Sequence, residues 1–318
     1  MPIVFVPRSR AITRSLRAKV SDSVSSEGRA GVIRLSWRGS MRRSSLAFAP
    51  GFSKTRSTAC NLRRVLGMKI TWFGHSAFGL ERNGRKILVD PFLSGNPIFE
   101  AEGAGSVAEK MEAALKGVTD IVITHGHMDH IGDTLAIAEK TGATVFCNWD
   151  LGQWLAHKWE LRGTGKALNL ELMNAGGRIE RDGVSIRLVR ADHSAGVFEN
   201  GVFQTLGSPN GVIISVPGAP VIYHMGDTDI FAGMGLIAEL HEPDIVIAPI
   251  GDRFTMGPAT AALAMRRYFP KAKGVIPCHF RTFGALTGTK EEFKRELGPM
   301  AAHLLDLNPH ETITFSIG

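Results

Sequence analysis

The side chains best suited to chemistry are concentrated in one short segment, Thr124-His125-Gly126-His127-Met128-Asp129-His130. This segment begins at the last residue of the β-branched run Val118–Thr124. That run predicts a buried strand. Four such polar groups inside a strand would each need a buried partner, whereas a loop at the strand end can aim them at a cation. Imidazole suits zinc and similar transition metals, and a carboxylate adds a harder ligand. A solvated His-rich loop is the alternative, but with 11 histidines in 318 residues this spacing is improbable as an accident.

One loop cannot complete two metal sites, because a catalytic zinc ion takes about three protein ligands and a water. Three further candidates each follow a predicted strand, the usual place for ligand groups in α/β folds. They are His193 after Gly183–Arg190, Asp227 after Val221–His224, and His279 after Val275–Pro277. Each alone would more often be structural, but beside the first cluster all three are predicted to be ligands.

The elements that must position these residues form a layered pattern. The expected strands are Met68–Phe73, Lys86–Val89, Val118–Thr124, Ala143–Cys147, Gly183–Arg190, Gly211–Val216, Val221–His224, Asp244–Pro249 and Val275–Pro277. Asn83-Gly84 is expected to turn the first two into a hairpin. The expected helices are Ile131–Lys140 with a C-cap at Gly142, Leu151–Trp159, Pro258–Phe269 and Lys290–Leu297. Strand-rich halves interleaved with helices indicate an α/β protein with its helices outside.

The order HxHxDH, a distant His, Gly-Asp-Thr and a final His is similar to that of the metallo-β-lactamase superfamily. The segments Trp72–Phe78 (WFGHSAF), Phe254–Pro258 (FTMGP) and Pro277–Phe280 (PCHF) resemble the UPF0173 metal-dependent hydrolases, which are akin to ascorbate-6-phosphate lactonases. The resemblance covers residues 68–318 and none of 1–67. It implies an α/β (α+β) fold, a four-layer αββα sandwich with the metals at one edge between two sheets.

The resemblance also implies a ligand set and two divalent metal ions. The first metal would be held by His125, His127 and His193, the second by Asp129, His130 and His279, with Asp227 bridging both. Zn²⁺ is the expected ion, and Mn²⁺ or Fe²⁺ would also suit a His/Asp site.

A dinuclear site predicts a metal-dependent hydrolase. A metal-bridged hydroxide would attack a small-molecule substrate of the ester/lactone or phosphoester type. Asp129 would orient the nucleophile and could carry a proton to the leaving group. His75 is predicted to orient substrate or support the ligands, with a purely structural role as the alternative. Arg253 and Arg281 depart from the family pattern and would favour an anionic substrate if they face the pocket; otherwise they are solvated surface residues.

Three other functions are alternatives to hydrolysis. An iron-dependent oxidoreductase on the same fold would resemble superfamily members that replace the second histidine with an acid, and His127 argues against it. An RNA-processing nuclease shares HxHxDH but needs a basic surface. A non-catalytic protein on this fold is opposed by the complete ligand set.

The charge of the chain is unevenly distributed. The net charge is +7, from 37 basic and 30 acidic residues, but residues 1–67 hold 14 and 2 of these, a local net of +12. The remaining 23 and 28 give residues 68–318 a net of −5. The catalytic part therefore offers no electrostatic reason to expect nucleic acid as a partner.

Residues 1–67 are rich in Arg, Ser and Gly without a regular period, which predicts a disordered extension. It could be an organelle transit peptide, a basic tail for an acidic partner, or the result of an upstream start codon, with the protein beginning at Met68. We favour the last, because Met68 opens the first strand directly.

Three widely spaced cysteines, Cys60, Cys147 and Cys278, argue for a reducing, cytoplasmic location. The lack of a run of 18 apolar residues argues against a membrane span. The expected partner is a small molecule, and the oligomeric state is left open.

Overall fold

The computed structural model describes residues 67–101 and 105–317, which form one compact unit. The predicted disordered extension, residues 1–67, lies outside the described residues except for Gly67. No helix of the described residues is long and apolar enough to cross a membrane.

Two large sheets form the centre of this unit. The first has the strand order β15-β1-β2-β3-β4-β5-β6 and the second β14-β13-β12-β11-β8-β7, while β9 and β10 form a separate hairpin. The strands are β1 Met68–Gly74, β2 Ala77–Arg82, β3 Arg85–Val89, β4 Asp120–Val122, β5 Thr144–Asn148, β6 Leu170–Met173, β7 Arg178–Arg181, β8 Val184–Arg190, β9 Gly196–Glu199, β10 Val202–Thr205, β11 Asn210–Ser215, β12 Ile222–His224, β13 Ile245–Pro249, β14 Gly274–Cys278 and β15 Thr312–Phe315.

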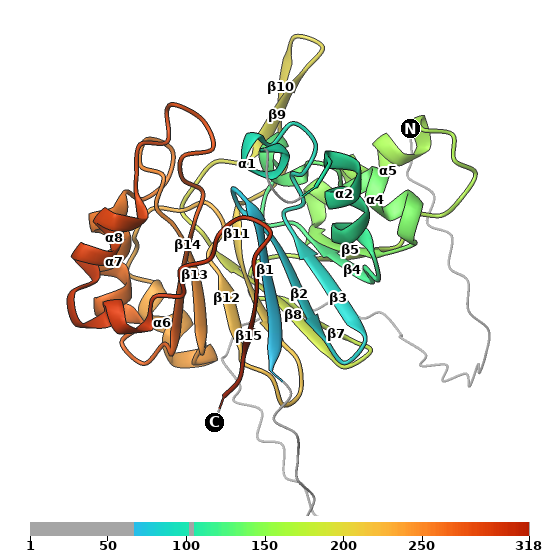
Figure 1. The fold of residues 1–318 in the computed structure, drawn as a ribbon. Coiled ribbons are helices and arrows are strands. Elements are labelled where there is room, and N and C mark those ends of the chain that lie inside the picture. The colour runs from blue at the N-terminus through green and yellow to red at the C-terminus, as the bar shows by residue number, and fades with distance from the viewer. Residues whose placement is uncertain (1–66, 102–104, 318) are drawn as a thin grey trace, which may run out of the picture. The chain divides into compact units, whose positions relative to one another are not determined.

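Helices cover the outer faces of both sheets (Figure 1). α2, α4 and α5 flank the first sheet, and α6, α7 and α8 flank the second. The helices are α1 Pro97–Glu100, α2 Val107–Leu115, α3 Met128–Ile131, α4 Thr134–Thr141, α5 Trp149–Leu161, α6 Met234–His241, α7 Pro258–Tyr268, α8 Lys290–Leu297 and the 3-10 helix η1 Gly298–His303. The predicted four-layer αββα sandwich is therefore confirmed.

The strands of the first sheet are apolar on both faces because each face packs on a different layer. In β3, Ile87 and Val89 join the core between the sheets, while Leu88 packs into the core beneath the helices. In β5, Phe146 faces the other sheet, whereas Val145 and Cys147 face the helices. Because successive strand residues point to opposite faces, a strand buried on both sides becomes a continuous apolar run.

The turn at Asn83-Gly84 is present, but it joins different strands from those predicted. Asn83 and Gly84 have φ values of 51° and 75°, as a type I′ hairpin turn requires. They link β2 to β3, and β2 itself was missed by the sequence analysis. The error arose because Ala77–Arg82 contains Gly79 in its middle, which weakens the strand pattern.

The helix predicted to begin at Ile131 begins at Thr134 instead. Gly132 has a φ of 43°, and a Cβ there would lie 2.4 Å from the carbonyl oxygen of Pro91. The helical conformation is therefore interrupted between α3 and α4. Gly142, with φ 72°, caps the C-terminus of α4 as predicted.

The strand directions bring the candidate ligands together at one edge. In the first sheet β3, β4, β5 and β6 are parallel, and two antiparallel steps give β1 the same direction. In the second sheet β12, β13 and β14 are parallel, and β8 shares their direction through β11. The loops that follow these strands therefore gather at common sheet edges, where α/β folds usually bind ligands.

Candidate metal centre

The structure brings His125, His127 and His193 together as one group. Each offers a ring nitrogen, and the three nitrogens lie within 4.8 Å of one another. Nε2 of His125 and Nδ1 of His127 are 2.9 Å apart. His125 is fully buried. These are the residues predicted to hold the first metal.

A second group contains His130, His279 and Asp129, together with His75. The Asp129 carboxylate lies 3.9 Å from Nε2 of His279. The rings of His130 and His279 are stacked with centroids 5.7 Å apart. These include the three residues predicted to hold the second metal, and His75 is an addition to that set.

Asp227 lies between the two groups. Its Oδ2 atom is 3.0 Å from Nε2 of His279, 3.4 Å from Nε2 of His130 and 3.6 Å from Nε2 of His193. One buried carboxylate thus contacts both halves of the cluster, the position expected of a bridging ligand.

Asp90, which the sequence analysis missed, orients the ring of His130. This buried carboxylate directly follows β3 and accepts hydrogen bonds from the Thr124 amide at 2.8 Å, the Thr124 hydroxyl at 2.7 Å and Nδ1 of His130 at 2.7 Å. Because Nδ1 of His130 donates its proton, Nε2 keeps a lone pair directed at the cluster. The signal in the sequence was an aspartate at the end of a predicted strand, immediately before Pro91.

Thr124 fixes the ring of His125 in the same way. The Thr124 hydroxyl donates its one proton to Asp90. In its contact of 2.9 Å with Nδ1 of His125 the hydroxyl oxygen must therefore be the acceptor, and Nδ1 the donor. We therefore assign the free lone pair of His125 to Nε2, the atom that faces His127. The backbone of β4 thus ends in a residue that determines the tautomer of the histidine that follows it.

The polar atoms of this cluster fit divalent cations. Among the described residues, Nε2 of His130, Oδ1 of Asp227 and both ring nitrogens of His279 are buried without a hydrogen-bond partner. Oδ2 of Asp227 is close to Nε2 of His279, but the two atoms are not aligned for a hydrogen bond. The facing nitrogens of His125 and His127 also need a proton or a cation between them. Buried polar groups of this kind are costly unless something binds them, and imidazole and carboxylate are ligands that zinc accepts.

The electrostatics of the cluster favour a cation as well. Burial lowers the pKa of His125, His127 and His193, so all three are neutral ligands near neutral pH. Burial alone would also lower the pKa of His130, but the charges of Asp227 and Asp90 raise it well above its usual range. Burial would raise the pKa of Asp227, yet the neighbouring His279 and His130 hold it well below its usual range. The position between these carboxylates therefore attracts positive charge.

His75 contacts the second group through Asp129. Its ring is fully buried at the end of β1, its Nε2 is 3.1 Å from Asp129, and its Nδ1 is 2.8 Å from the hydroxyl of Thr282. Burial lowers the pKa of His75 to about 4, so the ring is neutral. With Nδ1 accepting from Thr282, Nε2 donates to Asp129 and holds that carboxylate toward the cluster. Thr282 is a second residue that the sequence analysis missed.

His224, the last residue of β12, supports the loop of Asp227. Its Nδ1 accepts from the amide of Gly226 at 3.1 Å, and its Nε2 contacts the carbonyl oxygen of Ser76 at 3.2 Å. Gly226 has a φ of 64°, and a Cβ there would lie 2.5 Å from the carbonyl oxygen of Asn210. The turn that presents Asp227 therefore requires glycine.

Arg253 and Arg281 lie in the loops that follow β13 and β14. Both are exposed and have positive φ values, 40° and 55°. The Arg253 guanidinium lies over the ring of Phe254, 5.7 Å from its centroid. The structure thus places both cationic groups on loops at the ligand-bearing edge, His279 being two residues from Arg281.

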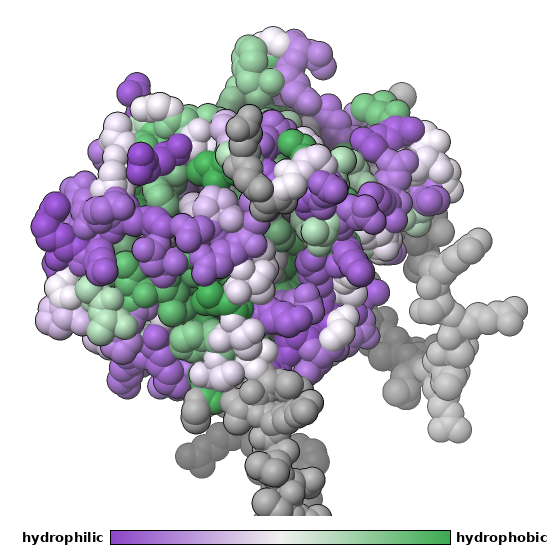
Figure 2. All heavy atoms as spheres, viewed as in Figure 1, coloured by the Kyte–Doolittle hydropathy of each residue, from purple (hydrophilic) through white to green (hydrophobic). Residues whose placement is uncertain are grey.

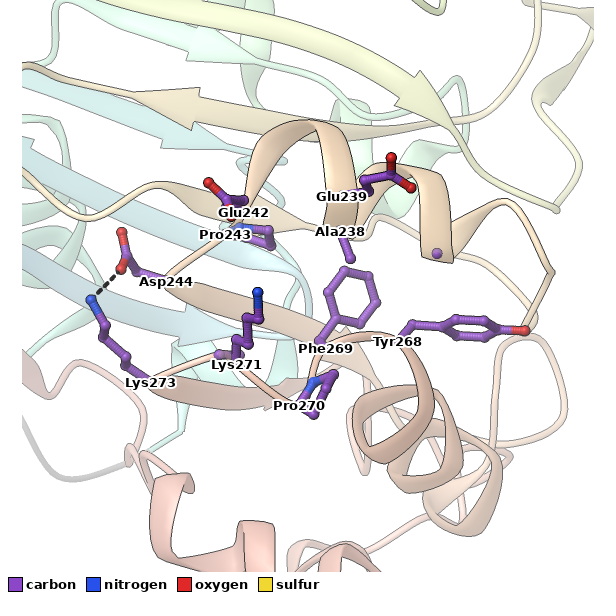
Figure 3. Close-up of a pocket in the computed structure, with 12 residues that line it drawn as sticks. Ala238, Glu239, Glu242, Pro243, Asp244, Tyr268, Phe269, Pro270, Lys271 and Lys273 are labelled. Atoms are coloured by element: carbon purple, nitrogen blue, oxygen red, sulfur yellow. Dashed lines mark hydrogen bonds and ion pairs between the residues drawn. The ribbon is translucent and has the colours of Figure 1, made fainter.

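A separate pocket of about 660 Å³ opens at the other end of β13 and β14 (Figure 3). It is lined by residues of α6, by the end of α7, and by Asp244 and Lys273, which precede the two strands. Asp244 and Lys273 form an ion pair of 2.8 Å. None of the residues that line this pocket is a histidine or a cysteine, so the candidate chemistry lies in the His/Asp cluster.

Comparisons with known proteins agree with this geometry. The family model described as a beta-lactamase superfamily domain matches residues 69–279. A UPF0173 metal-dependent hydrolase of Methylobacterium nodulans is 50% identical over 227 residues, which are 71% of this chain and 90% of the relative. One of Agrobacterium fabrum is 46% identical over 249 residues, 78% of this chain and 100% of the relative.

A solved structure shows the same fold. Igni18, described as a novel metallo hydrolase from the hyperthermophilic archaeon Ignicoccus hospitalis, matches with a TM-score of 0.66 and 33% sequence identity. The match covers 79% of this chain and 99% of Igni18. The two-sheet sandwich with its His/Asp cluster defines a metal-dependent hydrolase of the metallo-β-lactamase superfamily. Within that superfamily, the chain belongs to the UPF0173 family of metal-dependent hydrolases. The likeness to ascorbate-6-phosphate lactonases stays a prediction.

Proposed function

We propose that this protein hydrolyses an ester, lactone or phosphoester bond in a small anionic molecule, using two divalent cations, with Zn²⁺ the first choice. The observation that carries the proposal is the position of Asp227. Its carboxylate lies within 3.6 Å of ring nitrogens from both groups of the cluster, so one residue would serve two cations.

The proposed role of each residue in the cluster follows from its position. His125, His127 and His193 would hold one cation, and Asp129, His130 and His279 the other, with Asp227 shared. When bound, such ions acidify water and polarise the oxygen of an electrophilic group. Asp129 is the only carboxylate of the cluster with appreciable exposure, 34% of its side chain. It is therefore placed to accept a proton from water and release it to a leaving group.

The preference for an anion rests on Arg253 and Arg281. Both guanidinium groups are exposed at the ligand-bearing edge, and no ion pair between described residues involves either one. A planar guanidinium matches the geometry of a carboxylate or phosphate. A small molecule is proposed rather than nucleic acid because residues 68–318 carry a net charge of −5.

A cytoplasmic location is part of the proposal. Cys147 and Cys278 are free, buried thiols. Free cysteines are typical of proteins that work in a reducing compartment.

The test measures metal content in the full chain. The protein is purified without chelators, and bound metals are counted by elemental mass spectrometry in the wild type, His127→Ala and His157→Ala. His157 is an exposed histidine on α5 and serves as the matched control. We expect about two metals per chain in the wild type and the control, and a clear loss in His127→Ala.

The metal identified in this way is then supplied in a hydrolysis screen of lactones, thioesters and phosphodiesters. Hydrolysis that His127→Ala abolishes and His157→Ala retains would support the proposal. A folded wild type that binds no metal after reloading with Zn²⁺, Mn²⁺ or Fe²⁺ would overturn it.

A further inference from the structure

The β9–β10 hairpin projects from the ligand-bearing edge of the fold (Figure 1). Its two ends adjoin the segments that carry the first group of histidines. It starts at Gly196, three residues after His193, and Ser194 lies 3.4 Å from Nε2 of His127. At its other end Leu206 packs over Gly126, where a Cβ would lie 2.6 Å from the Leu206 side chain. A ligand held by this hairpin would therefore lie beside the metal centre.

One face of the hairpin is aromatic and exposed. Phe198 and Phe203 are directly opposite each other in the ladder, so their side chains share a face. They are 72% and 59% exposed, although a phenyl ring gains by leaving water. The ring of Phe203 lies over Gly196, where a Cβ would be 2.5 Å from its Cζ atom. Phe203 therefore extends down the hairpin, toward the segment that carries His193.

On the other face of the hairpin, the side chains of β9 already have partners. Val197 is buried in the core beneath the helices, and Glu199 forms a 2.6 Å ion pair with Lys158 of α5. The aromatic face is thus turned away from α5. Figure 2 shows the same asymmetry, with hydrophobic atoms on the left side of the projecting hairpin and hydrophilic atoms on its right.

A third aromatic ring borders the second group. Phe283 is 41% exposed, and its ring is 5.6 Å from that of His75, the residue that contacts Asp129. Apolar surface is therefore exposed beside both halves of the cluster. Phe198 and Phe203 are neighbours in the ladder, and exposed apolar side chains that lie together mark binding sites more often than single ones do.

We propose that Phe198, Phe203 and Phe283 bind the apolar part of the substrate, which makes the substrate amphiphilic: an acyl chain or aryl group attached to the bond that is hydrolysed. This inference rests on the proposed hydrolase function and names its substrate class. The chemistry is that of an ester or lactone with an apolar tail, whose product is a carboxylate with the same tail. The continuity of the aromatic face with the His193 segment favours a substrate group over a second copy of the chain as the occupant.

The test uses straight-chain carboxylates from acetate to decanoate as product-like probes, with binding to the metal-loaded full chain measured by calorimetry. Complete burial of a methylene strengthens binding about fourfold. On an open surface we expect about half of that free energy per methylene, which corresponds to about a twofold change in Kd. We therefore expect Kd to fall about twofold per methylene in the wild type. In the Phe198→Ala/Phe203→Ala variant this dependence should flatten while acetate binding is unchanged.

Two control variants separate apolar contact from altered folding. Phe198→Leu/Phe203→Leu keeps apolar side chains on the hairpin and should keep most of the chain-length dependence. Leu240→Ala removes an equally exposed apolar side chain from α6 and should change nothing. Circular dichroism and Tm show whether each variant is folded.

The outcomes distinguish this inference from the proposed function. If esters are hydrolysed but Kd does not depend on chain length, or the alanine variant retains the wild-type dependence, the apolar site is refuted and hydrolysis stands. If chain length controls Kd but no ester or phosphoester is hydrolysed, the apolar site stands and the proposed function fails. If the alanine variant alters only the oligomeric state, measured by sedimentation, the aromatic face is an interface and the inference is overturned.

Discussion

Replacing Asp90 by asparagine should weaken metal binding although Asp90 is not itself a proposed ligand. The carboxylate accepts three hydrogen bonds within 2.8 Å, and an amide of the same shape has one acceptor oxygen. If the amide nitrogen turns to His130, it donates to Nδ1 and moves the imidazole proton to Nε2, where a ligand needs its lone pair. If it turns to the Thr124 amide, two buried donors face each other, which costs about 1–3 kcal/mol.

The size of the effect follows from the orienting role of Asp90. Loss of a carboxylate that orients a metal-bound histidine lowers affinity about 10- to 100-fold, roughly 1.4–2.7 kcal/mol. The larger loss should fall on the second metal, because Asp90 contacts His130 directly and reaches His125 of the first group only through Thr124. Competition with a chelator of known affinity, followed by elemental mass spectrometry, measures the two metals separately.

Asp133→Asn is the matched control for Asp90→Asn. The Asp133 carboxylate accepts from the amides of Leu93 and Ser94 through one oxygen, which asparagine retains, and it has no hydrogen bond to a histidine. This variant should keep both metals at wild-type affinity. A folded Asp90→Asn variant with wild-type affinity for both metals would show that tautomer control by Asp90 is wrong.

Two other residues give sharp predictions. His75→Ala should lower turnover about 10- to 100-fold with metal content unchanged, and His75→Gln, which keeps a donor for Asp129, should recover part of kcat; loss of metal in His75→Ala would instead make His75 a ligand. Burial raises the pKa of the Cys147 thiol from 9.0 to about 12, so the folded state disfavours the thiolate and stability is lost as pH rises above 9.0. Burial also raises the pKa of the Cys278 thiol, so both cysteines contribute to this loss. Between pH 8 and pH 10.5, Cys147→Ala should therefore lose about 2 kcal/mol less stability in urea unfolding than the wild type does. Equal losses in both proteins would contradict the assigned burial.

The sequence predicted the parts of the site that have a local signature. His125 to His130 lie in one segment, and His193, Asp227 and His279 each follow a strand, so all seven candidates could be named before the structure was known. The strand predicted at Val118–Thr124 is observed as β4, Asp120–Val122, and the helix predicted at Lys290–Leu297 is observed with those bounds. Both could be predicted because each has a local apolar pattern in the sequence.

The rest depended on tertiary contacts. Asp90 and Thr282 are single polar residues whose partners, His130 and His75, lie 40 and 207 positions away. The hairpin Gly196–Thr205 lacks the alternation of a half-buried strand, because β10 is exposed along its whole length. Strand β15 pairs with β1 across more than 240 residues, a separation that no local pattern encodes.

The backbone at the centre shows how the fold and the site depend on each other. His75, Asp90 and His279 have φ values of 53°, 45° and 54°, in the left-handed region that non-glycine residues rarely adopt. Each such residue costs about 1–2 kcal/mol, so the three together cost on the order of 5 kcal/mol. Each of the three is the first residue after a strand, namely β1, β3 or β14. A left-handed backbone conformation at that position turns the side chain out of the sheet and toward the cluster. Strain of this size persists only when other interactions oppose it, and a bound cation contributes its binding free energy to the folded state alone. The residues that aim the ligands are therefore residues whose conformation the metals would stabilise, which couples metal binding to the stability of this edge of the fold.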